Sequence, residues 1–149
     1  MIARFGRVPE AGQYYRRRPG IYALLPRGRQ LLLTFQDAPK PEYQLPGGGI
    51  DPGEHPMAAL HREVMEETGW KIAPIKRFGV FRRFAYMPEY DQYAEKICHV
   101  VLARPVYRLG PPSEPGHSAH WVDAESAKGL LGNAGDKHFA ALFLRFMAK

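Results

Sequence analysis

The stretch at residues 45–70, LPGGGIDPGEHPMAALHREVMEETGW, constrains the fold of this chain more than any other part of the sequence. Within it, residues 56–68 have helical periodicity, because Met57, Leu60 and Val64 fall on one apolar face. Three glutamates share a second face of the same helix. We therefore predict a helix with one side in the core and the other side acidic.

The predicted helix has recognisable ends. Pro56 stands at a first-turn position, where its missing N–H costs nothing, and Gly69 is a typical C-terminal stop. His55 is an unusual residue at the N-cap, where Ser, Thr, Asp or Asn is preferred. We expect the helix to run from Pro56 to Thr68.

Glu63, Glu66 and Glu67 form the acidic face at spacings i, i+3 and i+4. Like charges at these spacings cost a helix a few tenths of a kcal/mol, roughly, for each pair. Arg62 can offset some of this repulsion, and a hard divalent cation, which prefers several oxygen ligands, can offset the rest. The glycine run at residues 46–49 lets the backbone approach a metal or phosphate. The alternatives are a solvated acidic face and a simple tight turn.

Length and composition bound the class of protein. The 149 residues suit a single domain, 1–149, with its own core. No apolar run approaches the roughly 20 residues that cross a bilayer, and no signal-peptide pattern is present. We expect a soluble, cytoplasmic protein without a membrane partner. Cys98, the single cysteine, lies in an apolar stretch and is predicted to be a packed core thiol.

Positive charge is concentrated at the start of the chain. The net charge is +6, and residues 1–30 hold seven arginines against one acidic residue, Glu10. Such a segment can reach the phosphates of a substrate or of RNA, although a solvated face is more common for charge runs. We expect residues 1–18 to form a basic, mobile N-terminal segment.

Strand and helix patterns alternate along the chain and predict a mixed α/β sandwich. A hairpin is expected from two apolar runs joined by a short turn, and the glycine run is expected to be a loop. Asp123 is a candidate cap for a brief helix, and a C-terminal helix should carry Phe139 and Phe143. The strands are predicted at residues 20–25, 30–35, 43–45, 72–87, 96–107 and 119–122.

The opening stretch matches the pattern G-x5-E-x7-R-E-U-x-E-E-x-G-U, where U is a bulky apolar residue. Every fixed position is met, and this many constraints over 23 positions make the match specific. The chain thus resembles the Nudix hydrolases, MutT-like members included, which implies the Nudix fold, a mixed β-sheet sandwiched between α-helices. The matching residues are Gly48, Glu54, Arg62, Glu63, Val64, Glu66, Glu67, Gly69 and Trp70.

The resemblance implies metal-dependent hydrolysis of a pyrophosphate bond in a nucleoside diphosphate linked to another group. Mg²⁺ or Mn²⁺ would neutralise the phosphates and help water attack phosphorus. By the family pattern, the metal ligands would be Glu63, Glu66, Glu67 and the Gly47 carbonyl. Structural roles would fall to Gly48, Gly69 and the pair of Glu54 with Arg62.

The general base is less constrained, because family members take it either from the helix or from a later loop. Glu114, in the Pro-rich loop before the last predicted strand, is the first candidate by its order along the chain. Glu89, Glu95 and Glu125 are the other carboxylates outside the helix that we consider. Each of these four also fits a solvated surface carboxylate.

Substrate-binding residues are sought on the strand at residues 72–87. Arg82 and Arg83 alternate across it, so one of them can face the cleft and take a phosphate, the alternative being two exposed charges. Tyr86 is a candidate for stacking on a base. His117 and His120 form an H-x-x-H pair, which we interpret as loop and strand-end histidines rather than a zinc site.

Two functions from different classes follow. The first is a pyrophosphohydrolase acting on nucleotides or their derivatives, with an RNA 5′ end as a further substrate. The second is a non-catalytic Nudix-fold module that binds a nucleotide or RNA through the N-terminal arginines. The complete glutamate set favours the hydrolase, because a binding module has no need for a costly carboxylate cluster.

Overall fold

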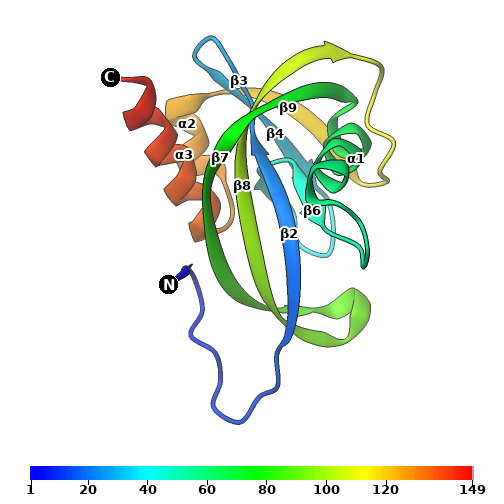
Figure 1. Cartoon of the computed structure of the whole chain (residues 1–149), viewed down its shortest axis with the longest axis vertical. Helices are drawn as coiled ribbons and strands as arrows, with labels where there is room; N and C mark the ends of the chain where they lie inside the picture. The colour runs from blue at the N-terminus through cyan, green and yellow to red at the C-terminus, as the bar shows by residue number, and fades with distance from the viewer. Residues whose placement is uncertain (149) are drawn as a thin grey trace.

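The computed structural model describes residues 1–148, and Figure 1 shows two sheets with helices on both sides. The first sheet has the strand order β1 (Ala3–Arg4), β7 (Trp70–Met87), β8 (Gln92–Arg108), β2 (Arg16–Leu24) and β6 (Gly47–Gly49). In the second sheet, β4 (Gln30–Gln36) pairs with β3 (Pro26–Arg27), β5 (Glu42–Gln44) and β9 (His117–Asp123). The helices are α1 (Pro56–Thr68), the short 3₁₀ helix η1 (Pro88–Tyr90), α2 (Ala124–Leu130) and α3 (Ala134–Met147).

Two hydrophobic clusters fill the layers between sheets and helices. One lies under α1, where Leu60 and Val64 pack with Ile21 of β2. The other lies under α2 and α3, where Phe139 packs with Phe81 of β7. Helices therefore cover opposite faces, α1 on one side and α2 with α3 on the other (Figure 1). This arrangement confirms the predicted fold class.

Helix α1 has the predicted bounds, and its ends explain why. His55 caps the N-terminus after all, because its Nδ1 accepts the N–H of Met57 at 3.1 Å. At the other end Gly69 is left-handed, with φ 77°, and its N–H donates to the Met65 carbonyl at 2.8 Å. A Cβ on Gly69 would lie 1.9 Å from the Gly110 carbonyl oxygen, so this position admits only glycine.

The predicted hairpin of residues 20–25 with 30–35 is wrong. The chain leaves the first sheet near Leu25 and enters the second, where the hairpin is formed by β3 and β4. Strand β2 pairs in parallel with β8 instead. Both apolar runs are buried on two faces, so their sequences lack the alternation that would identify their partners.

The glycine run is a strand rather than the predicted loop. Gly47–Gly49 forms β6, which pairs antiparallel with β2 at the edge of the first sheet. Gly47 has φ 148°, and a Cβ there would lie 2.2 Å from the Ile21 carbonyl oxygen. Three glycines show no side-chain alternation, so the sequence pattern cannot reveal this strand.

The N-terminal residues pair with the first sheet. Strand β2 begins at Arg16, four residues before the predicted start, and β1 pairs in parallel with β7. The Phe5 ring packs against Phe81 and His138, with centroid distances of 5.9 and 4.7 Å. Among residues 1–148, no helix combines the length and apolar character needed to span a membrane.

Candidate active site

Arg62 organises the acidic face of α1. Its guanidinium donates to both carboxylate oxygens of Glu54, at 2.8 and 3.0 Å, and to Glu63 at 3.0 Å. It also lies 3.5 Å from Glu66 and donates to the Gly49 carbonyl at 3.3 Å. The hydrogen bonds from Arg62 lower the pKa of Glu54 to about 2. The predicted contact of Glu54 with Arg62 is thus present and fastens the loop before α1 to the helix.

Glu67 is the buried carboxylate of this face, with 6% of its surface exposed. One oxygen accepts the N–H of Gly47 at 3.0 Å, and the other lies 3.7 Å from His117 Nδ1. Burial raises the pKa of Glu67 well above its ordinary value, and the charges of nearby carboxylates act in the same direction. Burial also raises the pKa of Glu63. Both carboxylates would therefore be stabilised by an added cation.

Gly47 can present its carbonyl on the same side as Glu67. The hydrogen bonds from Ala23 to Pro46 and from Ile50 to Pro19 set the register of β6 on β2. In that register Gly47 is in a non-hydrogen-bonded pair, so its N–H and carbonyl point away from β2. The N–H of Gly47 donates to Glu67, and the Gly47 carbonyl points in the same direction as this N–H. This orientation leaves the Gly47 carbonyl available as a ligand.

Gly48 and Gly69 allow neighbouring parts of the chain to pack closely against α1. A Cβ on Gly48 would lie 2.5 Å from the carboxyl carbon of Glu63, so glycine permits the close approach of β6 to α1. The carbonyl of Gly69 accepts the N–H of Leu109 at 2.8 Å. The fixed glycines of the motif thus occupy close backbone contacts on both sides of α1.

The loop that carries Glu114 is attached to α1 through the main chain. The N–H groups of Ser113 and Glu114 both donate to the Glu66 carbonyl, at 2.9 Å each. The Glu114 charge raises the pKa values of Glu63 and Glu67, so its carboxylate lies within their electrostatic field. The structure therefore brings Glu114 to the carboxylate face, with its side chain exposed.

The other candidate bases lie elsewhere. Glu95 pairs with Arg17 and Arg82, both at 3.3 Å. Glu125 pairs with Lys128 at 3.0 Å on α2. Glu89 lies in η1, at the tip of the β7–β8 hairpin. Of the four carboxylates considered outside the helix, Glu114 is the one placed beside the acidic face of α1.

A cavity of about 190 Å³, here called the inner pocket, opens beside Glu67. The same pocket is lined by Arg83 and Lys96, which are direct cross-strand partners on β7 and β8. Burial lowers the pKa of Lys96, and the charge of Arg83 adds to this effect. Within residues 1–148, neither side chain has a carboxylate within 4.0 Å. Two adjacent, partly buried cations favour an anion between them.

The predicted substrate-binding residues divide between two faces of β7. Arg83 faces the inner pocket, whereas Arg82 points to the other face and donates to Glu95 at 3.3 Å. Tyr86 is exposed, packs on Tyr93 at a centroid distance of 5.0 Å, and donates its hydroxyl to Asp91. Arg82 is therefore not brought into the cleft.

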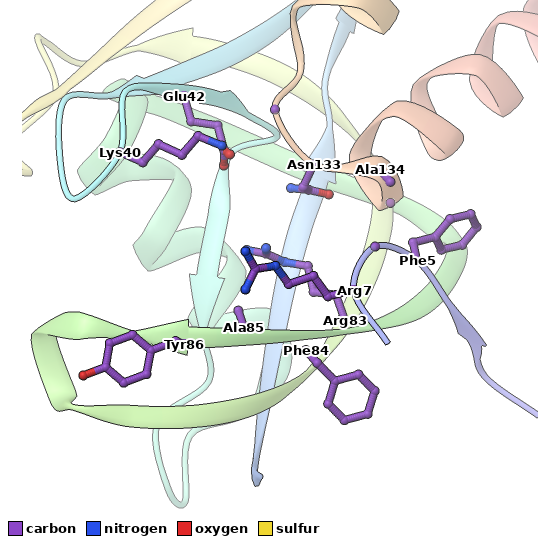
Figure 2. Close-up of a pocket in the computed structure, with 13 residues that line it drawn as sticks. Phe5, Arg7, Lys40, Glu42, Arg83, Phe84, Ala85, Tyr86, Asn133 and Ala134 are labelled. Atoms are coloured by element: carbon purple, nitrogen blue, oxygen red, sulfur yellow. The ribbon is translucent and has the colours of Figure 1, made fainter. Parts of the chain in front are cut away.

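A second cavity, of about 380 Å³, is also lined by Arg83. Figure 2 shows the residues around it. Arg83 and Asn133 line both this outer pocket and the inner one, so the two adjoin. The outer pocket takes its name from its position farther from Glu67. Its lining includes Arg7, Lys40, Glu42, Arg83, Tyr86 and Asn133.

Several pocket residues are not identified by their sequence patterns. Lys96 interrupts an apolar strand on the same face as Cys98, and this alternation was the available signal. Cys98 itself is buried, as predicted. Asp136 is buried on α3, accepts the N–H of Leu45 at 3.1 Å, and has its pKa raised by burial to about 6. Its partner lies 91 residues away, beyond the reach of a local pattern.

The two histidines of the H-x-x-H pair point to different surroundings. His117 begins β9, lines the inner pocket, and has its Nδ1 3.0 Å from Thr34 Oγ1. His120 is exposed and bonds to Ser118 Oγ at 2.8 Å. No three His, Cys, Asp or Glu side chains of residues 1–148 are grouped as a metal site. The donors near α1 are carboxylates held by Arg62 and Gly47, the oxygen type that Mg²⁺ accepts.

Solved structures of low sequence identity share this fold. A NUDIX hydrolase from Nitrosomonas europaea superposes with a TM-score of 0.72 at 16% identity, over 87% of this chain and 90% of that chain. A MutT protein from Methanosarcina mazei Go1 superposes with a TM-score of 0.71 at 22% identity, over 93% and 100% of the two chains.

Curated relatives match over shorter regions. A putative 8-oxo-dGTP diphosphatase of Bacillus subtilis is 34% identical over 70 residues, covering 47% of each chain. An RNA pyrophosphohydrolase of Rhodospirillum rubrum is 41% identical over 63 residues, 42% of this chain and 38% of the relative. The chain thus aligns with less than half of the length of these two relatives. The model of the NUDIX domain matches residues 15–143, and the chain, with its complete motif on β6 and α1, belongs to the Nudix hydrolase family.

Proposed function

We propose that this protein hydrolyses a pyrophosphate bond in a nucleotide or nucleotide derivative, with a divalent cation, Mg²⁺ or Mn²⁺, as cofactor. The observation that carries the proposal is that residues of opposite charge line one pocket. Buried Glu67 lines it from α1, next to β6, and the partners Arg83 and Lys96 line it from β7 and β8. A metal at the carboxylates and a phosphate chain at the basic side chains would neutralise both sets of charges.

The residues of α1 and β6 fit a divalent cation. The ligands would be Glu63, Glu66, Glu67 and the Gly47 carbonyl. Burial and mutual repulsion destabilise the charged carboxylates, and a bound cation would offset both effects. A cation bound there supplies the charge that lets water attack phosphorus. Glu63 and Glu66 would exchange their contacts with Arg62 for it, while Arg62 would keep its two bonds to Glu54.

The remaining steps belong to side chains around the pocket. Arg83 and Lys96 would bind the phosphate oxygens and orient the bond to be cleaved. Glu114, fixed beside α1 by the bonds from its loop to Glu66, would accept the proton of the attacking water. Glu54 and Arg62 would hold the loop and helix in position without contacting the substrate.

The names of relatives support two substrate classes. One relative is named for 8-oxo-dGTP, a nucleoside triphosphate derivative, and others are named RNA pyrophosphohydrolase or NAD-capped RNA hydrolase. Both classes contain the pyrophosphate link that the pocket walls suit. We therefore propose nucleotides and 5′-polyphosphorylated RNA as the substrates to compare.

The test is release of phosphate or pyrophosphate from a panel of nucleoside triphosphates, nucleotide sugars, dinucleoside polyphosphates and 5′-triphosphorylated RNA. Each substrate is incubated with Mg²⁺, with Mn²⁺ and with chelator. We expect metal-dependent cleavage of at least one class. Nucleotide binding by a folded protein without cleavage across the panel would instead support a non-catalytic binding module.

A further inference from the structure

The N-terminal segment, residues 3–15, contributes to the cleft although most of it precedes the region that matches the family. The start of the segment is attached to β7. Strand β1 pairs with β7, and the N–H of Phe5 donates to the backbone carbonyl of Arg82 at 3.0 Å. Tyr15 attaches its end, because its ring packs on Phe84 and Tyr93 at centroid distances of 4.9 and 5.7 Å. The segment is therefore held at both ends beside β7.

Between these attachments the chain turns and brings Arg7 over the outer pocket. Gly6 has φ 83°, a conformation that glycine adopts without strain, and it directs the following residue back toward β7. Arg7 and Arg83 then point into the same pocket from different elements (Figure 2). Lys40 adds a third cation from the loop after β4, and Glu42 is the one carboxylate among the lining residues.

The outer pocket has the size and charge for a nucleotide unit carrying its own phosphate. Its volume is about 380 Å³, twice the roughly 190 Å³ of the inner pocket. Guanidinium groups bind phosphate in a fork that matches its oxygens. Tyr86 lines the edge of the pocket with its ring directed away from Arg83 (Figure 2), toward Tyr93. Arg7 and Lys40 are also exposed, so a chain occupying this pocket could continue into solvent.

We propose that the outer pocket binds the second nucleotide of a 5′-polyphosphorylated oligonucleotide, with Arg7 and Arg83 on the phosphate that links it to the first. The inference rests on the proposed function, since the inner pocket would hold the 5′ phosphates. Arg83 lines both pockets and so lies at the junction between these two phosphate positions. The N-terminal segment is then the element that distinguishes an oligonucleotide from a mononucleotide.

The experiment compares kcat/KM for a nucleoside triphosphate, a dinucleoside tetraphosphate and a 5′-triphosphorylated RNA trinucleotide. The variant Arg7→Gln removes one phosphate contact, and Arg16→Gln is the matched control, an exposed arginine at the start of β2 outside both pockets. We expect Arg7→Gln to lower the ratio of trinucleotide to triphosphate kcat/KM by about tenfold. Arg16→Gln should leave that ratio unchanged.

Equal losses on all three substrates, or the same loss on the dinucleoside tetraphosphate, would overturn the proposal, because neither requires an internucleotide phosphate. Binding separates this result from a failure of the proposed function. In chelator, a fluorescent 5′-phosphorylated RNA trinucleotide is titrated and followed by anisotropy at several salt concentrations. We expect Arg7→Gln to weaken binding about tenfold and to reduce the salt slope by roughly 0.7. An unchanged affinity and slope would refute the outer-pocket assignment even if hydrolysis is observed.

Discussion

Replacing Lys96 with methionine should stabilise the free protein and weaken its binding to phosphates. Lys96 is opposed to Arg83 across the β7–β8 ladder, and burial already lowers its pKa. Like charges directly opposite on a sheet cost up to about 1 kcal/mol. Removing one of them should raise Tm by roughly 2–4 °C for a chain of this size. Methionine keeps most of the volume and can pack near Cys98.

The same substitution removes a charged donor from the pocket. Loss of a hydrogen bond to a charged partner costs about 1.5–3 kcal/mol, so Lys96→Met should raise the Kd for pyrophosphate or a nucleoside triphosphate at least about tenfold. Thermal unfolding and titration calorimetry measure the two effects on one sample. Lys71→Met, at an exposed position of β7, is the matched control and should change neither.

Coupling between the two cations supplies the decisive comparison. In the Lys96→Met background, Arg83→Met should no longer raise Tm, because the repulsion it would relieve is already gone. A decrease of Tm for Lys96→Met, or full additivity of the two stabilisations, would refute the reasoning that these side chains repel each other in the free protein.

Three further changes test the carboxylate face and its supports. Glu67→Gln keeps an acceptor for the Gly47 N–H, so it should raise Tm in chelator and abolish turnover; retained activity would contradict the ligand assignment. Gly69→Ala should lower the unfolding free energy by about 1–3 kcal/mol, measured by urea denaturation, whereas Gly49→Ala, which meets no neighbour, should be nearly neutral. The folded pKa of Asp136, about 6, exceeds its ordinary 3.8, so wild type loses stability as pH rises from about 4 to 6. Asp136→Asn should gain up to about 3 kcal/mol relative to wild type across that window, and parallel pH profiles would contradict this.

Local patterns in the sequence predicted the helix that carries the clustered carboxylates. Helix α1 was predicted with correct bounds because its signals are local: apolar spacing, Pro56 at the first turn and Gly69 at the end. The contact of Glu54 with Arg62 was implied by the resemblance to the Nudix pattern, and the structure contains it. Glu114 was placed by order along the chain, and its loop does lie beside α1.

Features that depend on long-range register could not be predicted in the same way. Lys96 lines the inner pocket beside Arg83 because the register of β7 with β8 pairs these two residues, and no local sequence pattern indicates that register. The glycines of β6 lack side chains to alternate, and the apolar second half of β2 is buried on both faces, so neither sequence indicates its partner. Arg7 lines the outer pocket because β1 pairs with β7 and the chain then turns at Gly6. A strand of two residues is too short for its sequence to predict this pairing.

The attachment of the Glu114 loop to α1 has a consequence for how this protein can be redesigned. The contacts from Ser113 and Glu114 to Glu66, and from Leu109 to Gly69, are made by backbone atoms and do not depend on which side chains the loop carries. Residues of this loop can therefore be exchanged without releasing it from the helix. Directed evolution could move an acidic residue along the loop and retune the proposed proton acceptor while the helix that carries the other carboxylates stays fixed.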